Sequence, residues 1–309
     1  MTCPYYKKDK VKYMKKYIFL VAAFFVAAFV VKAVSTDDEA EQSAEAPATE
    51  ATTTPSASDD SESATESTAS STSTTNDSSI KYELPAPLTD RPEQIINHTG
   101  YTLSFNSEHN TPNWSAWELT SDELSGDVPR STKFWADEQV KKRANRVDYY
   151  DYKDSGYDRG HMCPASDMKW NYNAMHDCFY MTNMCPQDRA LNSGSWNSLE
   201  NKCRSWARTE GSVYIVCGPV YDTGTHEQIG IDHAIDVPEG FFKAVLSLRE
   251  GHEKAIAFYF NNTSDSQPYR EAALSVDEIE ELTGIDLFYQ LDDKLEKKVE
   301  SQCSIRDWR

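Results

Sequence analysis

The sequence Asp158-Arg159-Gly160-His161 places a guanidinium and an imidazole two residues apart. In an extended segment both side chains would lie on the same face, so both could reach one phosphate group. An imidazole with an ordinary pKa is unprotonated for much of the time at neutral pH, which suits His161 to the role of general base. Gly160 lets the backbone approach a substrate closely because it has no Cβ. These residue types indicate hydrolysis of a phosphodiester, with Arg159 on the anion and His161 on the attacking water.

A second pair of polar residues, Asn192 and Glu200, falls on a predicted helix that begins near residues 193–195 and ends before Gly211. At roughly 100° per residue, Glu200 lies about 80° around the helix from Asn192, so both side chains can project into one cleft. A carboxamide oxygen and a carboxylate suit Mg²⁺, which keeps most of its water ligands. Each residue taken alone also has a simpler explanation, Asn192 as the helix N-cap and Glu200 as a solvated surface residue.

The elements that must position these residues are mostly strands. Alternating or β-branched and aromatic residues predict strands at 101–106, 114–119, 213–220, 241–248 and 255–260, with a turn at 111–113. Ser275 and Glu278 form a predicted capping box for a helix that runs to Gly284. Strands on both sides of a helical insertion predict an α+β fold with a mixed, largely antiparallel sheet core.

The first 35 residues predict a targeting segment. Residues 18–31 are 14 uncharged, mostly apolar residues that follow a lysine-rich stretch and precede Ala33-Val34-Ser35. A spanning helix usually needs about 20 apolar residues, which favours a cleaved signal peptide over a retained membrane anchor at 18–31. Both alternatives predict export, with the rest of the chain secreted, periplasmic or held on the outer face of a membrane.

Residues 36–79 predict a disordered acidic linker rich in Ser and Thr, and residues 80–309 a single globular domain. The whole chain carries a net charge of −19, of which −14 remains on residues 80–309 once the basic leader and the acidic linker are set aside. The domain is therefore acidic, which excludes recognition of nucleic acid through a generally basic surface. A polyanionic substrate must be attracted by local cations and a divalent metal ion.

Six cysteines follow the apolar segment, namely Cys163, Cys178, Cys185, Cys203, Cys217 and Cys303. An even number in a chain that is expected to be exported predicts disulfide bonds, although the spacings select no pairing. The same spacings lack the tight cysteine pairs of a zinc site.

From about residue 101 to residue 291 the chain resembles the DNA/RNA non-specific endonuclease family. The motif at 158–161 carries the resemblance together with Thr182-Asn183, Pro186-Gln187, Leu191-Asn192, Trp196-Asn197 and Leu199-Glu200.

The resemblance implies a ββα-metal (His-Me finger) active site. His161 would be the general base, and Asn192 would be the direct protein ligand of Mg²⁺, with Mn²⁺ as an acceptable substitute. Glu200 would act in catalysis by holding water around the ion, and Asn183 would support the site and the substrate phosphate. Arg159 would take part in catalysis by contacting the substrate.

The family also has a basic residue upstream of the motif, which Arg130 or Lys133 could supply; we favour Arg130 as the substrate-binding residue. The implied substrates are DNA and RNA, cleaved without strong sequence preference, and a homodimer is a further expectation. Two alternatives stay open at this point: an exported phosphodiesterase for another polyanion, and a non-catalytic nucleic-acid-binding module. The intact set of reactive residues argues against the second.

Overall fold

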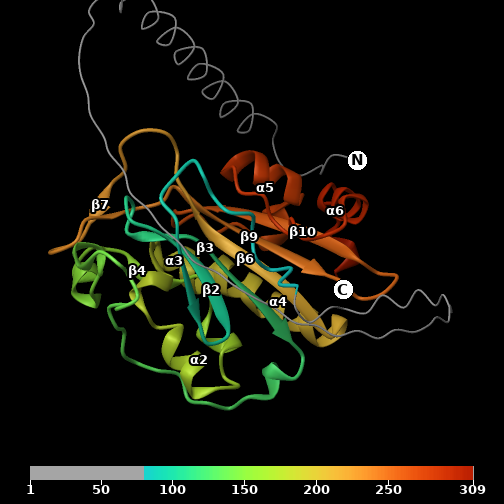
Figure 1. The fold of residues 1–309 in the computed structure, drawn as a ribbon, viewed down its shortest axis with the longest axis horizontal. Helices are drawn as coiled ribbons and strands as arrows, with labels where there is room; N and C mark the ends of the chain where they lie inside the picture. Colours follow the sequence, from blue (N-terminus) through green and yellow to red (C-terminus); the bar gives the residue numbers. More distant parts are fainter. Residues whose placement is uncertain (1–79, 309) are drawn as a thin grey trace, which may run out of the picture. The chain divides into compact units, whose positions relative to one another are not determined.

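The computed structural model of the protein describes residues 80–308 (Figure 1). The predicted targeting segment at 1–35, including the apolar stretch at 18–31, and the predicted linker at 36–79 lie outside these residues. Within residues 80–308, no helix combines the length and the apolar character needed to cross a membrane. Self-association, which the resemblance led us to expect, stays a prediction.

A seven-stranded sheet dominates the described part of the chain, and every neighbouring pair of its strands is antiparallel. This confirms the predicted α+β class and the antiparallel core. In spatial order the strands are β1 (Gln94–His98), β2 (Tyr101–Asn106), β3 (Thr111–Thr120), β6 (Ser212–Val220), β9 (Gly240–Ser247), β10 (Lys254–Asn261) and β11 (Ala273–Leu274).

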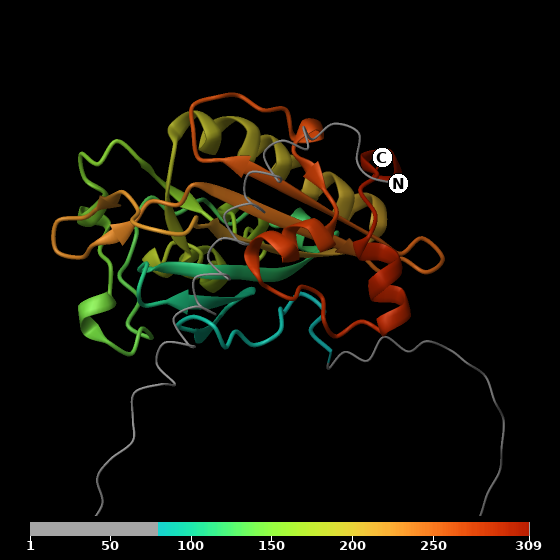
Figure 2. The ribbon, with the colours of Figure 1, turned by 90° about the horizontal axis from the view of Figure 1, so that it is seen from above.

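Both faces of this sheet are covered, so its inner strands are buried on both sides. Along β6, Ile215 and Cys217 join the apolar core that contains helix α4 (Asn197–Glu210), whereas the alternate residue Val216 joins the core beneath α5 (Val276–Thr283) and α6 (Asp293–Glu300). Figure 2 shows α4 on one side of the sheet and the two C-terminal helices, in red, on the other. Successive side chains along a strand point to opposite faces of the sheet, so the apolar residues of each strand are divided between these two cores.

The predicted turn at 111–113 is wrong, because β3 begins at Thr111. The pairing of β2 with β3 shifts register between Ser104 and Phe105, and Pro112 lies opposite Phe105 at this irregularity. Proline has no N–H to donate, so a bulge is a position in a sheet that tolerates it. The chain turns instead at residues 107–110, where Asn110 has a φ of 55°.

The small two-stranded sheet of β4 (Asp158–His161) and β5 (Met184–Gln187) lies outside the main sheet, and α2 (Tyr172–Asp177) lies between its strands in the sequence. A helical segment follows β5 at once, beginning with α3 (Arg189–Leu191), continuing through a π-helical turn at Asn192–Trp196 and running into α4. Two antiparallel strands followed by a helix form the expected ββα motif. A second small sheet joins β7 (Gln228–Ile229) to β8 (Ile235–Asp236).

The helix that carries Asn192 starts earlier than predicted. Asp188 is its N-cap, accepting hydrogen bonds from the backbone N–H groups of Ala190 and Leu191. Asn192 is therefore not the N-cap of this helical segment. The predicted capping box of α5 is confirmed: the Ser275 and Glu278 side chains bond to each other's backbone N–H, and Gly284 ends the helix with a φ of 69°.

The expectation of disulfides is not supported, since no disulfide joins any two cysteines within residues 80–308. Cys163, Cys178, Cys185, Cys203 and Cys217 are all buried in the main core. Burial raises the pKa of each of these thiols, to about 12 for Cys178 and Cys203 and to about 11 for Cys217. They act as small apolar core residues, a role in which cysteine is common.

Candidate active site

A cavity of about 750 Å³ opens beside β4 and the start of the helical segment. Its lining combines four cationic side chains with two carboxylates, one imidazole and one carboxamide. These residues are Arg130, Lys153, Arg159 and Arg189, then Asp154 and Asp158, and finally His161 and Asn192. The arrangement concentrates positive charge locally in a chain whose net charge is negative.

His161 lies at the end of β4 with its side chain almost fully buried; the residue is 8% exposed. The ring packs edge-on against Phe179, with 4.8 Å between ring centroids, and the indole N–H of Trp196 donates to the His161 backbone carbonyl at 3.3 Å. Its Nε2 atom has no hydrogen-bond partner among the residues that the structure describes. Burial, together with the positive charges of Arg130 and Arg159, lowers the pKa of His161 to about 3. The ring is therefore neutral and can accept a proton.

Arg159 lies on the same side of β4 as His161, as the spacing predicted, and both line the cavity. The Arg159 guanidinium lies over the Phe134 ring, 4.6 Å from its centroid, and the Arg130 guanidinium lies over Phe179 at 5.1 Å. Stacking on an aromatic face holds a guanidinium in place while leaving its N–H groups available in the plane. Of the two upstream candidates, the cavity lining formed by residues 80–308 includes Arg130 and not Lys133.

Asn192 reaches the cavity from the π-helical turn and is partly exposed. Its Nδ2 donates to Oδ2 of Asp158 at 3.1 Å, and Oδ1 of Asp158 accepts from Nε of Arg189 at 3.1 Å. Asp158 therefore fixes which end of the Asn192 carboxamide is a donor and leaves Oδ1 of Asn192 as its acceptor atom. π-Helical turns inside helices are frequent at functional sites, and this one changes the predicted angle between Asn192 and Glu200.

Asn183 is fully buried and all of its side-chain atoms are used within the protein. Its Oδ1 accepts from the backbone N–H of Cys163 at 2.9 Å and from the Ser115 hydroxyl at 3.1 Å, while Nδ2 donates to the carbonyl groups of Cys163 and Cys178, each at 2.9 Å. The side chain is thus not available to a substrate in this structure. It holds the segment that follows His161 against the end of α2.

Glu200 lies on α4, and the part of the chain that the structure describes does not bring it into the cavity lining. Burial raises the pKa of Glu200 to about 7, although the nearby positive charges of Lys243, Arg204 and Arg130 oppose this shift. Its predicted role around a metal ion stays a prediction. Lys243 itself is fully buried between the rings of Trp117 and Trp196, at 5.0 and 4.4 Å from their centroids.

Four charged residues of the cavity received no role from the sequence, namely Lys153, Asp154, Asp158 and Arg189. Asp158 stood inside the motif, but its contact with Asn192 spans 34 positions and requires the ββα geometry. Arg189 follows directly after Asp188, and a cation in the first helical turn carries no sequence signal for anion binding. Only the proximity of β4 to this helical turn brings Asp158 and Arg189 together.

The sequence matches the model of the DNA/RNA non-specific endonuclease family over residues 79–294. One relative is "Nuclease 1, mitochondrial" of Schizosaccharomyces pombe, 31% identical over 225 residues that cover 67% of this chain and 68% of the relative. Another is "Mitochondrial nuclease" of Saccharomyces cerevisiae, 31% identical over 253 residues that cover 74% and 75%. Among solved structures, the EndoG/EndoGI complex contains a chain of similar fold, with a TM-score of 0.64 and 27% identity over 70% of this chain and 91% of that one.

The prediction of export is wrong by this comparison, because the names of both yeast relatives place those proteins in mitochondria. The predicted signal peptide and secretion have no support either. Basic residues before a short apolar stretch indicate affinity for a membrane, but they do not specify which membrane. The chemistry expected from the motif is unaffected by this correction. By its sequence and its fold, this chain belongs to the DNA/RNA non-specific endonuclease family and is a hydrolase that acts on phosphodiester bonds.

Proposed function

We propose that this protein is a Mg²⁺-dependent endonuclease that cleaves DNA and RNA without strong sequence preference, using His161 as the general base and Asn192 as the protein ligand of the metal ion. The proposal depends above all on one observation: Nε2 of His161 is buried in the cavity lining without a hydrogen-bond partner among the described residues. A buried polar atom without a hydrogen-bond partner destabilises the folded state unless a ligand or a water molecule forms a hydrogen bond with it.

The environment of His161 supports its role as a base. Its pKa of about 3 keeps the ring unprotonated at neutral pH. Such a low value also makes a free imidazole a weak base, since efficient proton transfer needs a pKa near the working pH. A bound phosphodiester places negative charge beside Arg130 and Arg159, which offsets the charges that lower the His161 pKa. We therefore expect the pKa of His161 to rise toward neutrality when the substrate binds.

The residues present also fit a divalent metal ion, which enzymes of this family use. Oδ1 of Asn192 is an oxygen ligand atom in the cavity lining, and the hydrogen bond from Nδ2 to Asp158 orients the carboxamide. One neutral oxygen ligand suits Mg²⁺, which sheds its water reluctantly, and Mn²⁺ accepts the same ligands. When bound, the ion would supply Lewis-acid stabilisation of the phosphate and its leaving oxygen.

The remaining side chains would bind and orient the substrate. Arg159 and Arg130 would contact the phosphate, since both guanidiniums lie in the cavity on aromatic supports. Asn183 would act by holding the backbone after His161, consistent with its four internal hydrogen bonds. In its ionised form, the Glu200 carboxylate would help to organise the water around the metal ion.

Cleavage of plasmid DNA and of RNA by the His161→Ala variant tests the proposal. We expect a loss of roughly 100-fold or more in rate, the usual contribution of a general base. His176→Ala is the matched control, because His176 is a partly exposed histidine on α2 outside the cavity lining. Full activity of His161→Ala in a clean preparation would refute the assignment.

The choice of substrate separates this proposal from a phosphodiesterase for another polyanion. The wild-type rate on plasmid and RNA is compared with its rate on a small phosphodiester at equal phosphate concentration. We expect the nucleic acids to be cleaved faster, because the cationic cavity can hold phosphates adjacent to the one that is cleaved. A strong preference for the small substrate would contradict the proposal.

A further inference from the structure

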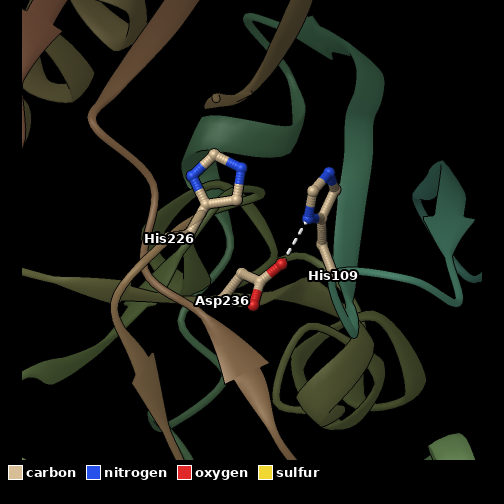
Figure 3. A group of neighbouring side chains, drawn as sticks. All are labelled: His109, His226 and Asp236. Atoms are coloured by element: carbon tan, nitrogen blue, oxygen red, sulfur yellow. Dashed lines mark hydrogen bonds and ion pairs between the residues drawn. The ribbon is translucent and has the colours of Figure 1, made fainter. Parts of the chain in front are cut away.

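A second cluster of ligating side chains lies away from the catalytic cavity, where His109, His226 and Asp236 come together (Figure 3). The three residues come from separate segments: His109 from the turn between β2 and β3, His226 from the segment before β7, and Asp236 from β8. One ligand atom from each lies within 4.8 Å of the other two. We propose that this cluster binds a zinc-class divalent transition-metal ion that ties the β7–β8 hairpin to the main sheet.

The hydrogen bonds around His226 prepare it as a metal ligand. Its Nδ1 lies 3.0 Å from Oε1 of Glu239, so the carboxylate favours the tautomer in which Nδ1 carries the proton. Nε2 then keeps its lone pair, and in Figure 3 one ring nitrogen of His226 faces the side on which His109 lies. A histidine that donates one ring N–H to a carboxylate while binding a metal through the other nitrogen is the common arrangement in metal sites.

The other two ligands are held in place by contacts with their neighbours. The His109 ring stacks on Tyr221 with 3.9 Å between centroids and 11° between planes, and its Nδ1 lies 2.6 Å from Oδ2 of Asp236. The second oxygen of Asp236 accepts from the Gln228 side chain at 2.7 Å. A metal ion would replace the proton that Nδ1 of His109 and Oδ2 of Asp236 share, and that proton would be released to solvent. These two atoms and Nε2 of His226 would then surround the ion.

The donor set identifies the class of metal. Two imidazoles and one carboxylate suit zinc and its neighbours, whereas Mg²⁺ prefers oxygen ligands alone. Four-coordinate zinc has bonds of about 2.0–2.2 Å to nitrogen and oxygen, which separates its ligand atoms by about 3.3 Å. Nδ1 of His109 and Oδ2 of Asp236 must therefore move apart from 2.6 Å, and His226 must move inward by up to about 1.5 Å. Water would complete the shell from the adjoining cavity of about 330 Å³, which His109 and His226 line.

The position of the cluster gives the ion a structural role. Glu227, the neighbour of His226, accepts a hydrogen bond from the Tyr157 hydroxyl at 3.0 Å, and Tyr157 lines the catalytic cavity. Ile229 and Ile235 of the hairpin pack in the same apolar cluster as Tyr152, which also lines that cavity. An ion bound by three separate segments would therefore brace one wall of the catalytic cavity without contacting it.

Zinc content of the full chain tests this inference independently of nuclease activity. The protein is stripped with EDTA, dialysed against ZnCl₂ with MgCl₂ in excess, and analysed by inductively coupled plasma mass spectrometry. We expect one zinc ion per chain in the wild type and in His161→Gln, which removes the catalytic imidazole. His226→Gln and Asp236→Asn should lose the ion, whereas His233→Gln should keep it, since His233 pairs with Asp151 at 2.8 Å.

Two further measurements test the inference even if a ligand variant fails to fold. Co²⁺ added to the stripped wild type should give the visible absorption of a four-coordinate nitrogen and oxygen site. Glu239→Gln, which leaves all three ligands in place, should weaken zinc binding about 10–100-fold. A stripped wild type that takes up no zinc would overturn the inference, as would zinc retained by a folded His226→Gln.

Discussion

At the scale of single residues, the defining feature is an imidazole kept neutral by its surroundings. Arg159 and His161 share one side of β4, and Arg130, 29 positions before the motif residue Arg159, adds positive charge from its place over the Phe179 ring. The spacing within the motif was sufficient to predict the first pair. The position of Arg130 depends on tertiary packing against Phe179, so the sequence left Lys133 as an alternative to it.

The buried neutral state of His161 makes stability depend on pH. The unfolded chain protonates this histidine near pH 6.5, whereas the folded protein resists protonation down to about 3. The unfolded state thus binds more protons in this interval, so stability falls as the pH drops through it. Between about pH 7.5 and pH 5 the wild type should lose about 2 kcal/mol more than His161→Gln. Urea unfolding of both proteins in EDTA measures this difference; equal losses would contradict a neutral His161.

The hydrogen bond from Asn192 to Asp158 predicts an effect on metal affinity. Asp158→Ala removes the group that orients the Asn192 carboxamide, so the Mg²⁺ concentration for half-maximal cleavage should rise about 10–100-fold. Asp154→Asn is the control: it removes a charge from the same cavity, leaves the Asp158 contact intact, and places asparagine where φ is 58°. An unchanged Mg²⁺ dependence in Asp158→Ala would show that Asn192 needs no such support.

Replacement of Asn192 itself should have a larger effect. Asn192→Ala removes the proposed protein ligand, and we expect nuclease activity to be lost with little recovery in excess Mg²⁺, because water cannot position the ion as the carboxamide does. The measurement is the cleavage rate across a Mg²⁺ titration. Restoration to the wild-type rate at high Mg²⁺ would show that another residue holds the ion.

At the scale of elements, the site depends on close contact between β4 and β5. Gly160 pairs with Cys185, and a Cβ at Gly160 would collide with the side chain of Gln187, including its Cβ at 2.6 Å. Gln187 is fully buried, so it cannot simply move into solvent.

The Gly160→Ala variant should therefore be destabilised by about 1–3 kcal/mol, as overpacked positions usually are. Gly194→Ala is the matched control, since no described atom other than its chain neighbours and own helix backbone lies within 4 Å of a Cβ there. Chemical denaturation compares the two variants. Equal stability of Gly160→Ala and the wild type would show that the two strands separate more easily than this packing implies.

The same elements show which parts of the fold the sequence could predict. The long strands β2, β6, β9 and β10 carry alternating or β-branched residues and were found within a residue or two. Strand β4 has four residues including a glycine, and β5 contains a proline, so neither shows the period of a strand. The π-helical turn at Asn192–Trp196 has no sequence signal, because it arises where the helix must present Asn192 to β4.

At the scale of the whole molecule, the net charge of the chain is negative, whereas the catalytic cavity gathers positive charge. The chain has a net charge of −19, yet the catalytic cavity gathers Arg130, Lys153, Arg159 and Arg189. The net charge was available from composition. The local concentration of cations was not, since these residues are spread over 60 positions and meet only in the fold.

The small number of cations predicts a moderate dependence of DNA binding on salt. Four phosphate contacts correspond to a slope of about −3 to −4 in a plot of log affinity against log salt concentration. Fluorescence anisotropy with duplex DNA and His161→Ala in EDTA would measure it, and adding Arg189→Ala should reduce the slope by about 1. A slope near −10 would indicate an extended basic surface and contradict a focused site.

The central claim is that His161 takes the proton from the attacking water, and chemical rescue tests it most directly. The single-turnover rate of plasmid cleavage by His161→Gly is measured with saturating Mg²⁺ and increasing imidazole. Without imidazole we predict a rate at least about 100-fold below the wild type. Added imidazole should enter the open cavity and restore part of the rate, in proportion to its unprotonated form. Cleavage by His161→Gly at the wild-type rate without imidazole would contradict the account.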